Sequence, residues 1–525
     1  MTNGKASEIK NKDPNQCCSC RDVLWYIVFA GFAVNYMVRM NLNIAIVSMV
    51  LPKPEDNISL TSECITRNPL NSNLTTLSFL NQTNSTSTQM SNSTLFQPNL
   101  EGTYFYWNER DISFILGSFF WFHWTTQIPG GVLATKFGTK RVFGLSNSIG
   151  VAFNFIIPWC AHRGAIPLIF LRSIQGLCLG VSWPSMHNLV SNWIPPNNRS
   201  KFISAYMGSS FGIAITYPLC GLIIERWGWE AAFYICGVIG TIWSLAWWLL
   251  VYDSPSEHPR ITPEEKKYII TSIGKNLSDK KPPIPWKAIC TDSSVWAGLI
   301  VYMGTGWSLY TLMVNIPTYF KFIHGWDIRS TGFISGMPHL LRIIFSYTVS
   351  MFGDFLLRTE KISRTNVRKL ATFCSNGLEG LCALALAYVG CNKIAAIVMS
   401  TLAVSCHGAI TTGVLAGQVD RSPNYSAILL GITNSGSTII GFFATMVVGL
   451  LTFQNQTTAQ WQKVFWICTV MLFSGCLFYL IFASAEVAAW NNPNESIPEA
   501  KRLVTKTKNR SSKVREGNNE SGNTI

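Results

Sequence analysis

Charged side chains are scarce in this sequence: Asp, Glu, Lys and Arg make up 13% of its 525 residues, whereas hydrophobic residues make up 48%. Soluble domains usually carry about 25% charged residues, so the composition argues against a string of water-soluble domains. It favours a chain whose solvent is lipid. The 19 tryptophans agree with this interpretation, because indole rings concentrate at membrane interfaces.

Signatures of catalysis and of metal binding are missing as well. The 15 cysteines show no zinc-site spacing. The apolar segments contain no metal-spaced His/Asp cluster, no nucleophile elbow and no phosphate-cradling glycine loop. We therefore expect neither an enzyme nor a chain with a bound cofactor or metal.

Apolar segments of about 20 residues, the length that a helix needs to cross the hydrocarbon core, recur along the chain. The first is too long for the core of a signal peptide and has no small-residue cleavage site, so we expect it to remain as a helix after a cytoplasmic tail at 1–22. Twelve such segments predict an all-α membrane protein, at residues 23–50, 112–134, 142–161, 165–188, 202–224, 231–252, 295–320, 330–353, 369–390, 393–416, 426–451 and 462–485.

A hydrophilic linker at 253–294 separates six predicted spans from six more. The chain thus divides into an N-terminal bundle, 23–252, and a C-terminal bundle, 295–485, followed by a second cytoplasmic tail at 486–525. In TPEE of the linker, Glu265 has the spacing of a capping box, which predicts a short amphipathic helix on the cytoplasmic face.

The formal net charge of +14 would fit a nucleic-acid partner if the basic residues lay together. Instead, 29 of the 41 Lys and Arg residues fall in the segments that an even number of spans places on the cytoplasmic side, 9 fall in the outer loops and 3 within the spans. This is the positive-inside asymmetry of a membrane protein. We expect the lipid bilayer as a partner and no nucleic acid.

The predicted outer loop at 51–110 is rich in Ser, Thr and Asn. Cys64, Cys160 and Cys391 also fall on or near the outer side, where a disulfide can form, but the sequence leaves their pairing open. Within the loop, five N-x-S/T sequons predict glycosylation, at Asn57, Asn73, Asn81, Asn84 and Asn92.

Between the second and third predicted spans lies GGVLATKFGTKR, residues 130–141. It resembles the signature loop of the major facilitator superfamily, with Thr135 in the place of the usual aspartate, and SMFGDFLLR of the eighth span resembles a partial second copy. The resemblance implies a major facilitator fold of two pseudo-symmetric six-helix bundles. We expect the two loops to take part in conformational change through Gly131, Lys136, Gly138, Lys140, Arg141 and Asp354.

Three basic residues fall within the predicted spans: Arg39, Arg172 and Arg342. An arginine at the bilayer centre costs about 2.5 to 3.5 kcal/mol on insertion scales, so such residues usually face a bundle interior or a wet cavity. Arg39 and Arg342 lie about eleven residues inside their segments, too far for the side chain to reach the headgroups. Arg172 lies only seven residues into its span, so snorkelling to the headgroups stays open there.

Together the arginines predict an anion site, since guanidinium binds carboxylate or phosphate through paired hydrogen bonds. The spans hold little acid beyond Glu379, so we expect no carboxylate partner for the arginines and infer that a visiting anion takes that place. Two tyrosines are also candidates for this site. In the alternative interpretation, these tyrosines are interfacial or packed residues. Further candidates for the anion site, near an arginine or in the seventh span, are Tyr36, His339 and Tyr310.

A narrower family resemblance rests on YMVRMNLNIAIVSMV, GSFFWFHWTTQIPGG, WIPPNNRSKF, ERWGWEAAFYICG, PTYFKF and SAILLGITNSGSTIIG. These stretches resemble the solute carrier 17 family, which includes sialin, the vesicular glutamate transporters and the sodium-phosphate cotransporters. The resemblance implies transport of organic anions or phosphate by alternating access. It also implies that Arg39 and Arg172 match the family's arginines of spans 1 and 4.

Departures from the family pattern narrow the expected function. Leu179, Leu116 and Thr305 stand where sialin or the vesicular glutamate carriers have a glutamate, a histidine and an arginine. Proton coupling thereby loses its usual carrier, so we expect a sodium-coupled symporter of inorganic phosphate or a small organic anion at the plasma membrane. A sialin-like, proton-coupled exporter of sialic acid or acidic amino acids from lysosomes or vesicles is the first alternative, and an anion channel is the second.

Overall fold

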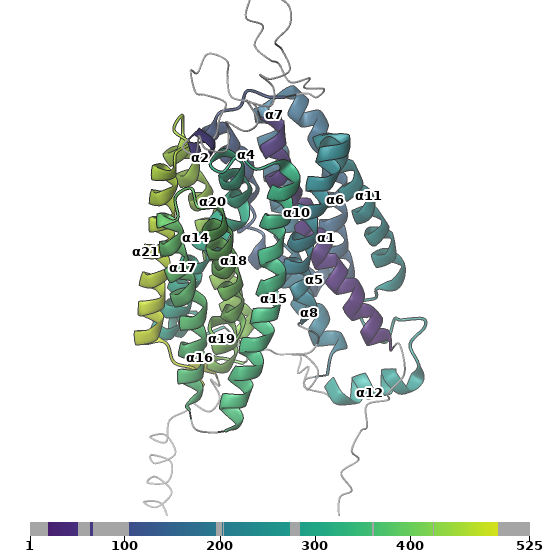
Figure 1. Cartoon of the computed structure of the whole chain (residues 1–525). Helices are drawn as coiled ribbons and strands as arrows, with labels where there is room; N and C mark the ends of the chain where they lie inside the picture. Colours follow the sequence, from purple (N-terminus) through teal and green to yellow (C-terminus); the bar gives the residue numbers. More distant parts are fainter. Residues whose placement is uncertain are drawn as a thin grey trace, which may run out of the picture.

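The computed structural model describes residues 19–50, 63–66, 104–195, 202, 204–273, 284–359, 362–423 and 425–491. Over these ranges the chain is helical, with one isolated bridge between Val50 and Phe105. The helices form two groups that lie side by side, one coloured purple to teal and the other green to yellow (Figure 1). The five predicted glycosylation sites lie outside the described residues.

The N-terminal group holds a core of aromatic residues between its helices. Trp247 packs on Phe143 with ring centroids 4.8 Å apart, and its indole N–H donates to the Lys140 carbonyl oxygen at 3.0 Å. The helices of this group are α1 (Cys20–Met49), α4 (Glu109–Trp121), α5 (Gln127–Phe137), α6 (Thr139–Arg163), α7 (Ala165–Leu179), α8 (Ser182–Trp193), η3 (Ser204–Met207), α10 (Gly208–Trp227) and α11 (Trp229–Leu250).

Two long helices of the C-terminal group begin at aspartate caps, which satisfy backbone N–H groups that the first turn leaves free. Asp292 accepts from Ser294 N at 2.9 Å, and Asp327 accepts from Ser330 N at 3.0 Å. The helices here are α13 (Trp286–Thr291), α14 (Ser293–Phe322), α15 (Ile328–Arg358), α16 (Arg364–Thr372), the π-helical η5 (Phe373–Gly377), α17 (Leu378–Tyr388), α18 (Lys393–Cys406), η6 (His407–Thr411), α19 (Val414–Arg421), α20 (Ser426–Thr452), α21 (Thr458–Phe482) and η7 (Ala489–Asn491).

Eleven helices of the described residues are long and apolar enough to cross a membrane, whereas the sequence predicts twelve spans. The difference lies at the predicted span 112–134, because the chain leaves the helical path between α4 and α5. Thr125 Oγ1 donates to the Phe122 carbonyl at 2.7 Å, and Thr126 Oγ1 donates to the Leu177 carbonyl of α7 at 2.9 Å. Hydroxyls that bond backbone carbonyls in this way compete with a continuous helix, so two shorter helices fill the place of the second span.

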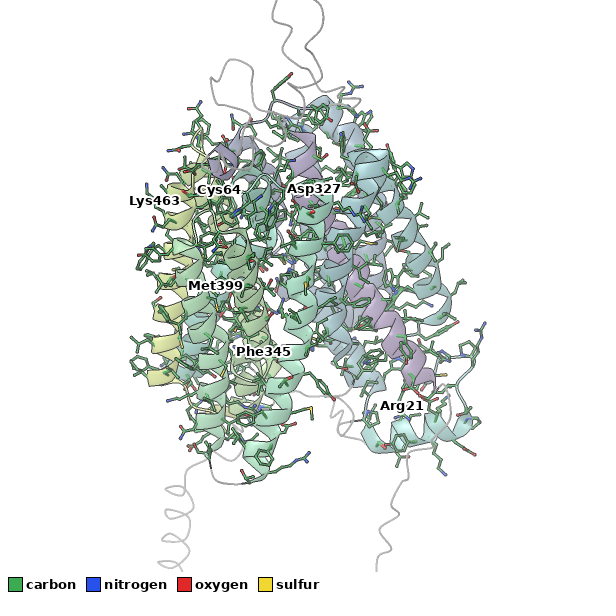
Figure 2. All side chains as sticks on the ribbon, in the orientation of Figure 1. Arg21, Cys64, Asp327, Phe345, Met399 and Lys463 are labelled. Atoms are coloured by element: carbon green, nitrogen blue, oxygen red, sulfur yellow. A yellow bond between two sulfur atoms is a disulfide. The ribbon has the colours of Figure 1, made fainter. Side chains whose placement is uncertain are left out.

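The linker contains the predicted helix, α12 (Pro263–Ile273), beside the start of α1. Thr262 Oγ1 accepts from Glu265 N at 3.3 Å and so caps this helix. The Glu265 carboxylate also accepts from Cys20 N at 3.1 Å and from Arg21 Nε at 3.1 Å. Figure 2 places Arg21 beside α12. The linker is therefore anchored to the first membrane helix.

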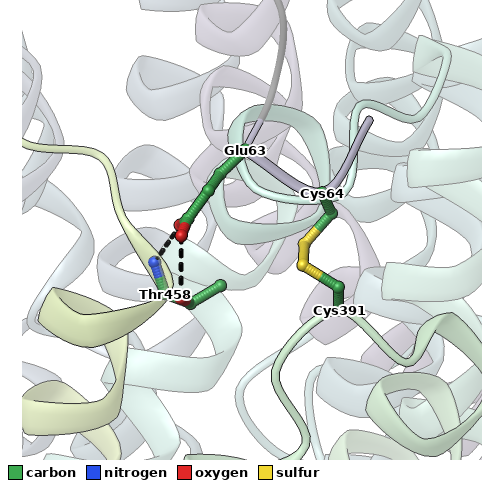
Figure 3. Close-up of a disulfide and its surroundings, with 4 residues drawn as sticks. All are labelled: Glu63, Cys64, Cys391 and Thr458. Carbon is green, nitrogen blue, oxygen red and sulfur yellow. Dashed lines mark hydrogen bonds between the residues drawn. A yellow bond between two sulfur atoms is a disulfide. The ribbon is translucent and has the colours of Figure 1, made fainter. Parts of the chain in front are cut away.

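At the opposite end of the molecule, a disulfide joins Cys64 of α2 (Glu63–Thr66) to Cys391 (Figure 3). Beside it, the Glu63 carboxylate accepts from Thr458 Oγ1 at 3.2 Å. Cys160, the third cysteine considered from the sequence, is a free thiol. Helix α2 is thus tied to the C-terminal group at this end, which we call the disulfide end.

The two helical groups approach each other closely through glycines of α15 and the backbone of α10. A Cβ atom on Gly332 would lie 2.5 Å from the Tyr217 carbonyl oxygen, and one on Gly336 would lie 2.8 Å from the Ala214 carbonyl oxygen. Small residues permit this separation of two backbones. From these contacts near the disulfide end, the two groups diverge toward the end that carries α12 and α16 (Figure 1).

Candidate functional site

Arg39 lies among aromatic rings that come from both helical groups. Its guanidinium carbon is 5.2 Å from the ring centre of Tyr36, 4.9 Å from Phe119, 4.8 Å from Phe120 and 5.5 Å from Tyr310 of α14. The residue is 3% exposed, and its Nε and Nη2 atoms have no hydrogen-bond partner. Ring faces stabilise a cation without using its N–H groups, so Arg39 keeps free donors at the boundary between the groups.

Arg172 of α7 points into the bundle and not toward the headgroups, which excludes snorkelling. Its Nη2 donates to the carbonyl oxygen of Arg39 at 2.9 Å, and its Nη1 donates to that of Val38 at 3.4 Å and to Gln175 Oε1 at 2.7 Å. Arg172 is 1% exposed and only its Nε lacks a partner. This arginine therefore holds the α1 backbone at Arg39.

Arg342 of α15 is half-buried and belongs to the other helical group. Tyr36, Tyr302 and Tyr310 lie within electrostatic range of its guanidinium. Tyr36 also interacts with Arg39. Because Tyr36 and Tyr310 border both cations, the structure brings Arg39 and Arg342 to one central region, which we call the arginine site.

Glu379 of α17 also lies within electrostatic range of Arg342. The carboxylate is a nearby charge for Arg342, and its direct contact is with a histidine. The Glu379 Oε2 atom is 3.3 Å from Nδ1 of His407 in η6. His339, one turn from Arg342 on α15, is 2% exposed, and its Nδ1 has no partner. Helix periodicity predicts that His339 lies near Arg342, whereas Glu379 and His407 come from other helices.

The loop after α5 is built as a tight turn around a carboxylate that the sequence reading missed. Gly138 has a φ of 86°, and Lys140 N donates to Asp253 Oδ1 at 2.7 Å. A Cβ atom on Gly138 would collide with the Asp253 carboxylate, so glycine is needed both for the backbone angle and for space. Lys136 and Arg141 are exposed. Asp253 lies three residues beyond the end of α11 and joins the end of that helix to this loop.

In the C-terminal half, the predicted Asp354 is exposed. The charged contacts at this end of the half are made by other residues. Arg368 of α16 donates from Nε to Asp420 Oδ2 of α19 at 2.7 Å and from Nη1 to the Thr412 carbonyl at 2.9 Å. Arg364 lies 3.8 Å from the same aspartate. The sequence repeat gave no sign of this pairing, because α16 and α19 are not adjacent in the chain.

The described residues offer no group of three or more His, Cys, Asp or Glu side chains that could hold a metal ion. Two buried asparagines of α1 use their side-chain nitrogens in contacts with α6, while Asn41 Oδ1 has no partner. Asn35 Nδ2 donates to Asn147 at 2.8 Å, and Asn41 Nδ2 donates to Asn154 at 3.2 Å. Ser308 Oγ is buried and lies within interaction range of the Glu379 carboxyl.

Two helical groups that enclose buried, partly unpaired cations at their boundary define a polytopic membrane transporter. The Major Facilitator Superfamily model matches residues 28–445. The chain belongs to that superfamily and, within it, to the solute carrier 17 family.

Two relatives carry the narrower assignment. Vesicular glutamate transporter 1 of Xenopus tropicalis is 32% identical over 522 residues, which cover 95% of this chain and 83% of that protein. A protein of Drosophila melanogaster named for inorganic phosphate cotransport is 32% identical over 511 residues, which cover 95% of this chain and 92% of that protein.

Solved structures agree with the fold. A bacterial homologue of the human lysosomal transporter Spinster, inward-facing and unoccupied, superposes with a TM-score of 0.61 at 13% identity, covering 90% of this chain and 100% of that one. The D-xylose-proton symporter superposes with a TM-score of 0.56 at 13% identity, covering 89% of this chain and 100% of that one.

Proposed function

We propose that this multi-pass membrane protein carries inorganic phosphate or a small organic carboxylate, and that the anion binds between Arg39 and Arg342. The observation that carries the proposal is the Arg39 guanidinium, which is buried at the boundary of the two halves with two nitrogens unpartnered. A buried charged donor without a partner is costly, and an anion would remove that cost. The names of the relatives, for glutamate and for phosphate, point to the same class of substrate.

Alternating access follows from where the site residues are attached. Arg39 and Tyr36 stand on α1, whereas Tyr310 and Arg342 stand on α14 and α15 of the other half. Rocking of one half against the other would therefore open and close the arginine site to each side in turn. The close glycine contacts near the disulfide end support a carrier that is closed at that end.

The proposal also includes the ion that drives transport and the membrane in which the protein works. The resemblance to the phosphate cotransporters supports sodium coupling at the plasma membrane, with cytoplasmic termini. Proton coupling in a vesicular or lysosomal membrane is the second candidate, and it is favoured by one observation, the buried Glu379 in electrostatic range of Arg342.

The deciding experiment uses purified full-length protein in liposomes with labelled phosphate or L-glutamate. Sodium gradients, proton gradients and membrane potential are imposed separately. We expect saturable uptake and counterflow of one of the two anions. An ohmic anion current far larger than the coupled flux would instead identify a channel, and uptake driven by a proton gradient alone would exclude sodium coupling.

A further inference from the structure

Glu379 holds an unusual position for an acidic residue. It is 1% exposed, and it is the buried acidic residue among the described residues of the membrane-spanning helices. It stands in the first turn of α17, directly after the π-helical turn η5 (Phe373–Gly377). Such turns inside a helix occur frequently at functional sites.

The Glu379 carboxylate is incompletely satisfied by its surroundings. Its Oε2 atom has His407 Nδ1 at 3.3 Å, and its Oε1 atom has no hydrogen-bond partner. The buried Ser308 hydroxyl lies within interaction range of the same carboxylate. A permanently ionised carboxylate in such a place usually has several hydrogen bonds and a dedicated cation. The groups that could stabilise an ionised Glu379 also interact with other residues.

Arg342 is one such group, because it interacts with Glu379 and also with the arginine site. Its electrostatic neighbours include both Glu379 and two residues of the arginine site, Tyr36 and Tyr310. The backbone packs tightly at this point, since a Cβ atom on Gly408, next to His407, would meet the Arg342 carbonyl oxygen at 2.4 Å. The backbone that carries Arg342 is therefore packed directly against the backbone that carries His407.

The other titratable groups around Glu379 come from several helices. His339 lies on α15 beside Arg342 and His407. Three cysteines, on α17, α18 and α21, are also in electrostatic range of Glu379: Cys382, Cys406 and Cys468. Arg342 and the two histidines are thus the groups that can bear positive charge here, and the histidines do so only when protonated.

We propose that Glu379 is the proton-binding group of this carrier, and that a substrate anion and a proton bind together because the anion and the Glu379 carboxylate compete for Arg342. This rests on the proposed function, since it needs an anion in the arginine site, and it takes proton coupling, the second candidate named there. When the anion engages Arg342, the carboxylate loses its cation and takes a proton from water on one oxygen. The same O–H bond breaks when the anion leaves on the other side.

Reciprocity makes the proposal measurable, because a proton that promotes anion binding must itself be bound more tightly when the anion is present. The test measures the affinity of full-length protein for L-glutamate and inorganic phosphate between pH 5.5 and 8. Glutamate keeps a constant net charge over this range. We expect wild-type affinity for L-glutamate to fall with rising pH, approaching tenfold per pH unit, and Glu379→Gln to bind L-glutamate with an affinity independent of pH.

A matched control exists at the protein surface. Glu230 and His162 form a second carboxylate–imidazole pair at 2.8 Å, with the Glu230 side chain 41% exposed. Glu230→Gln should keep the pH dependence of wild type. If Glu379→Gln does not fold, proton uptake by unbuffered wild-type protein on adding the anion answers the same question, with a value approaching one proton per anion expected.

The outcomes separate the two proposals. Wild type that binds neither anion would remove the proposed function and this inference with it. Wild type that transports an anion while Glu379→Gln keeps the same pH dependence would overturn the proton site alone. Sodium-driven transport without any proton uptake by wild type would overturn it too.

Discussion

Arg39 is stabilised by four ring faces and not by a carboxylate. Quadrupole attraction from the rings makes burial of the cation tolerable, yet it leaves the N–H donors free. An acidic neighbour at hydrogen-bond distance would have occupied those donors and repelled the substrate. The aromatic surroundings thus explain how the residue can be both buried and available.

We expect Arg39→Ala to abolish uptake while expression and membrane insertion persist. Loss of a buried charged donor from a ligand costs about 2 to 5 kcal/mol, which corresponds to a fall in kcat/KM of at least about thirtyfold. Arg226→Ala, a change at an exposed arginine on α10, is the control and should transport normally. Wild-type uptake by Arg39→Ala would remove Arg39 from the site.

Arg172 acts on the site through the α1 backbone, so we expect a different phenotype from Arg172→Lys. A lysine ammonium keeps the charge but cannot reproduce the planar set of bonds to Val38, Arg39 and Gln175. Loss of about 1 to 2 kcal/mol of positioning predicts a KM raised about five- to thirtyfold, with a lower melting temperature in detergent. An unchanged KM would show that Arg39 keeps its place without these bonds.

At the scale of elements, irregular segments carry much of the chemistry. The second span is interrupted beside Phe119, Phe120 and His123, and the ninth contains the π-helical turn before Glu379. His123 Nδ1 lies 3.0 Å from the Gly176 carbonyl oxygen of α7. The interruption therefore lies where rings surround Arg39 and where the α7 backbone is in contact.

Asp292 fixes the start of α14 and offers a test of element stability. Burial alone would raise its pKa, but the hydrogen bonds from Arg421 and Trp490, at 2.8 Å and 2.9 Å, together with the Arg421 charge, lower the pKa overall. A lowered pKa stabilises the folded state at pH values above the unfolded pKa, and this contribution is lost as pH falls through the folded value.

Asp292→Asn should therefore lower the stability at pH 7 by about 1 to 3 kcal/mol, measured as a thermal shift in detergent. The difference from wild type should shrink at pH values below the ordinary aspartate pKa of about 3.9. Asp327→Asn, which changes an aspartate cap on α15 bonded to Ser330 N, should have a smaller effect. Equal effects of the two changes would contradict a role for the Arg421 and Trp490 bonds.

At the scale of the whole molecule, the contact between α10 and α15 holds the halves together near the disulfide end. Gly332 and Gly336 pack on backbone atoms of Ala214 and Tyr217 and on the Pro218 ring. These contacts lie between two halves that must separate during alternating access. A side chain inserted here would act as a wedge.

We expect Gly332→Leu to favour the state that is open at the disulfide end, because the new side chain collides with the Tyr217 carbonyl. Transport should fall, and hydrogen–deuterium exchange should speed up at the facing ends of α10 and α15. Gly431→Leu is the matched control, since nothing lies within 4 Å of a Cβ at Gly431. Unchanged exchange in Gly332→Leu would contradict closure through this contact.

Much of the fold is predictable from local properties of the sequence. Hydropathy locates every predicted span within a few residues of a helical segment, and the aspartate caps and the TPEE helix follow from first-turn chemistry. The same logic places Arg39 and Arg342 in the bundle interior, because a buried guanidinium too far from the headgroups must face protein or water. These inferences need only neighbours within one helix.

The remaining features depend on residues far apart in the chain. Composition and periodicity determined by themselves a twelve-segment, two-bundle membrane protein with arginines turned inward. Only the tertiary structure decided that Cys64 pairs with Cys391, that Asp253 closes the loop at Gly138, that Arg172 bonds the α1 backbone, and that Glu379 lies near Arg342. The physical reason is that helix patterns encode which face is buried, whereas packing of one helix on another determines which buried groups meet.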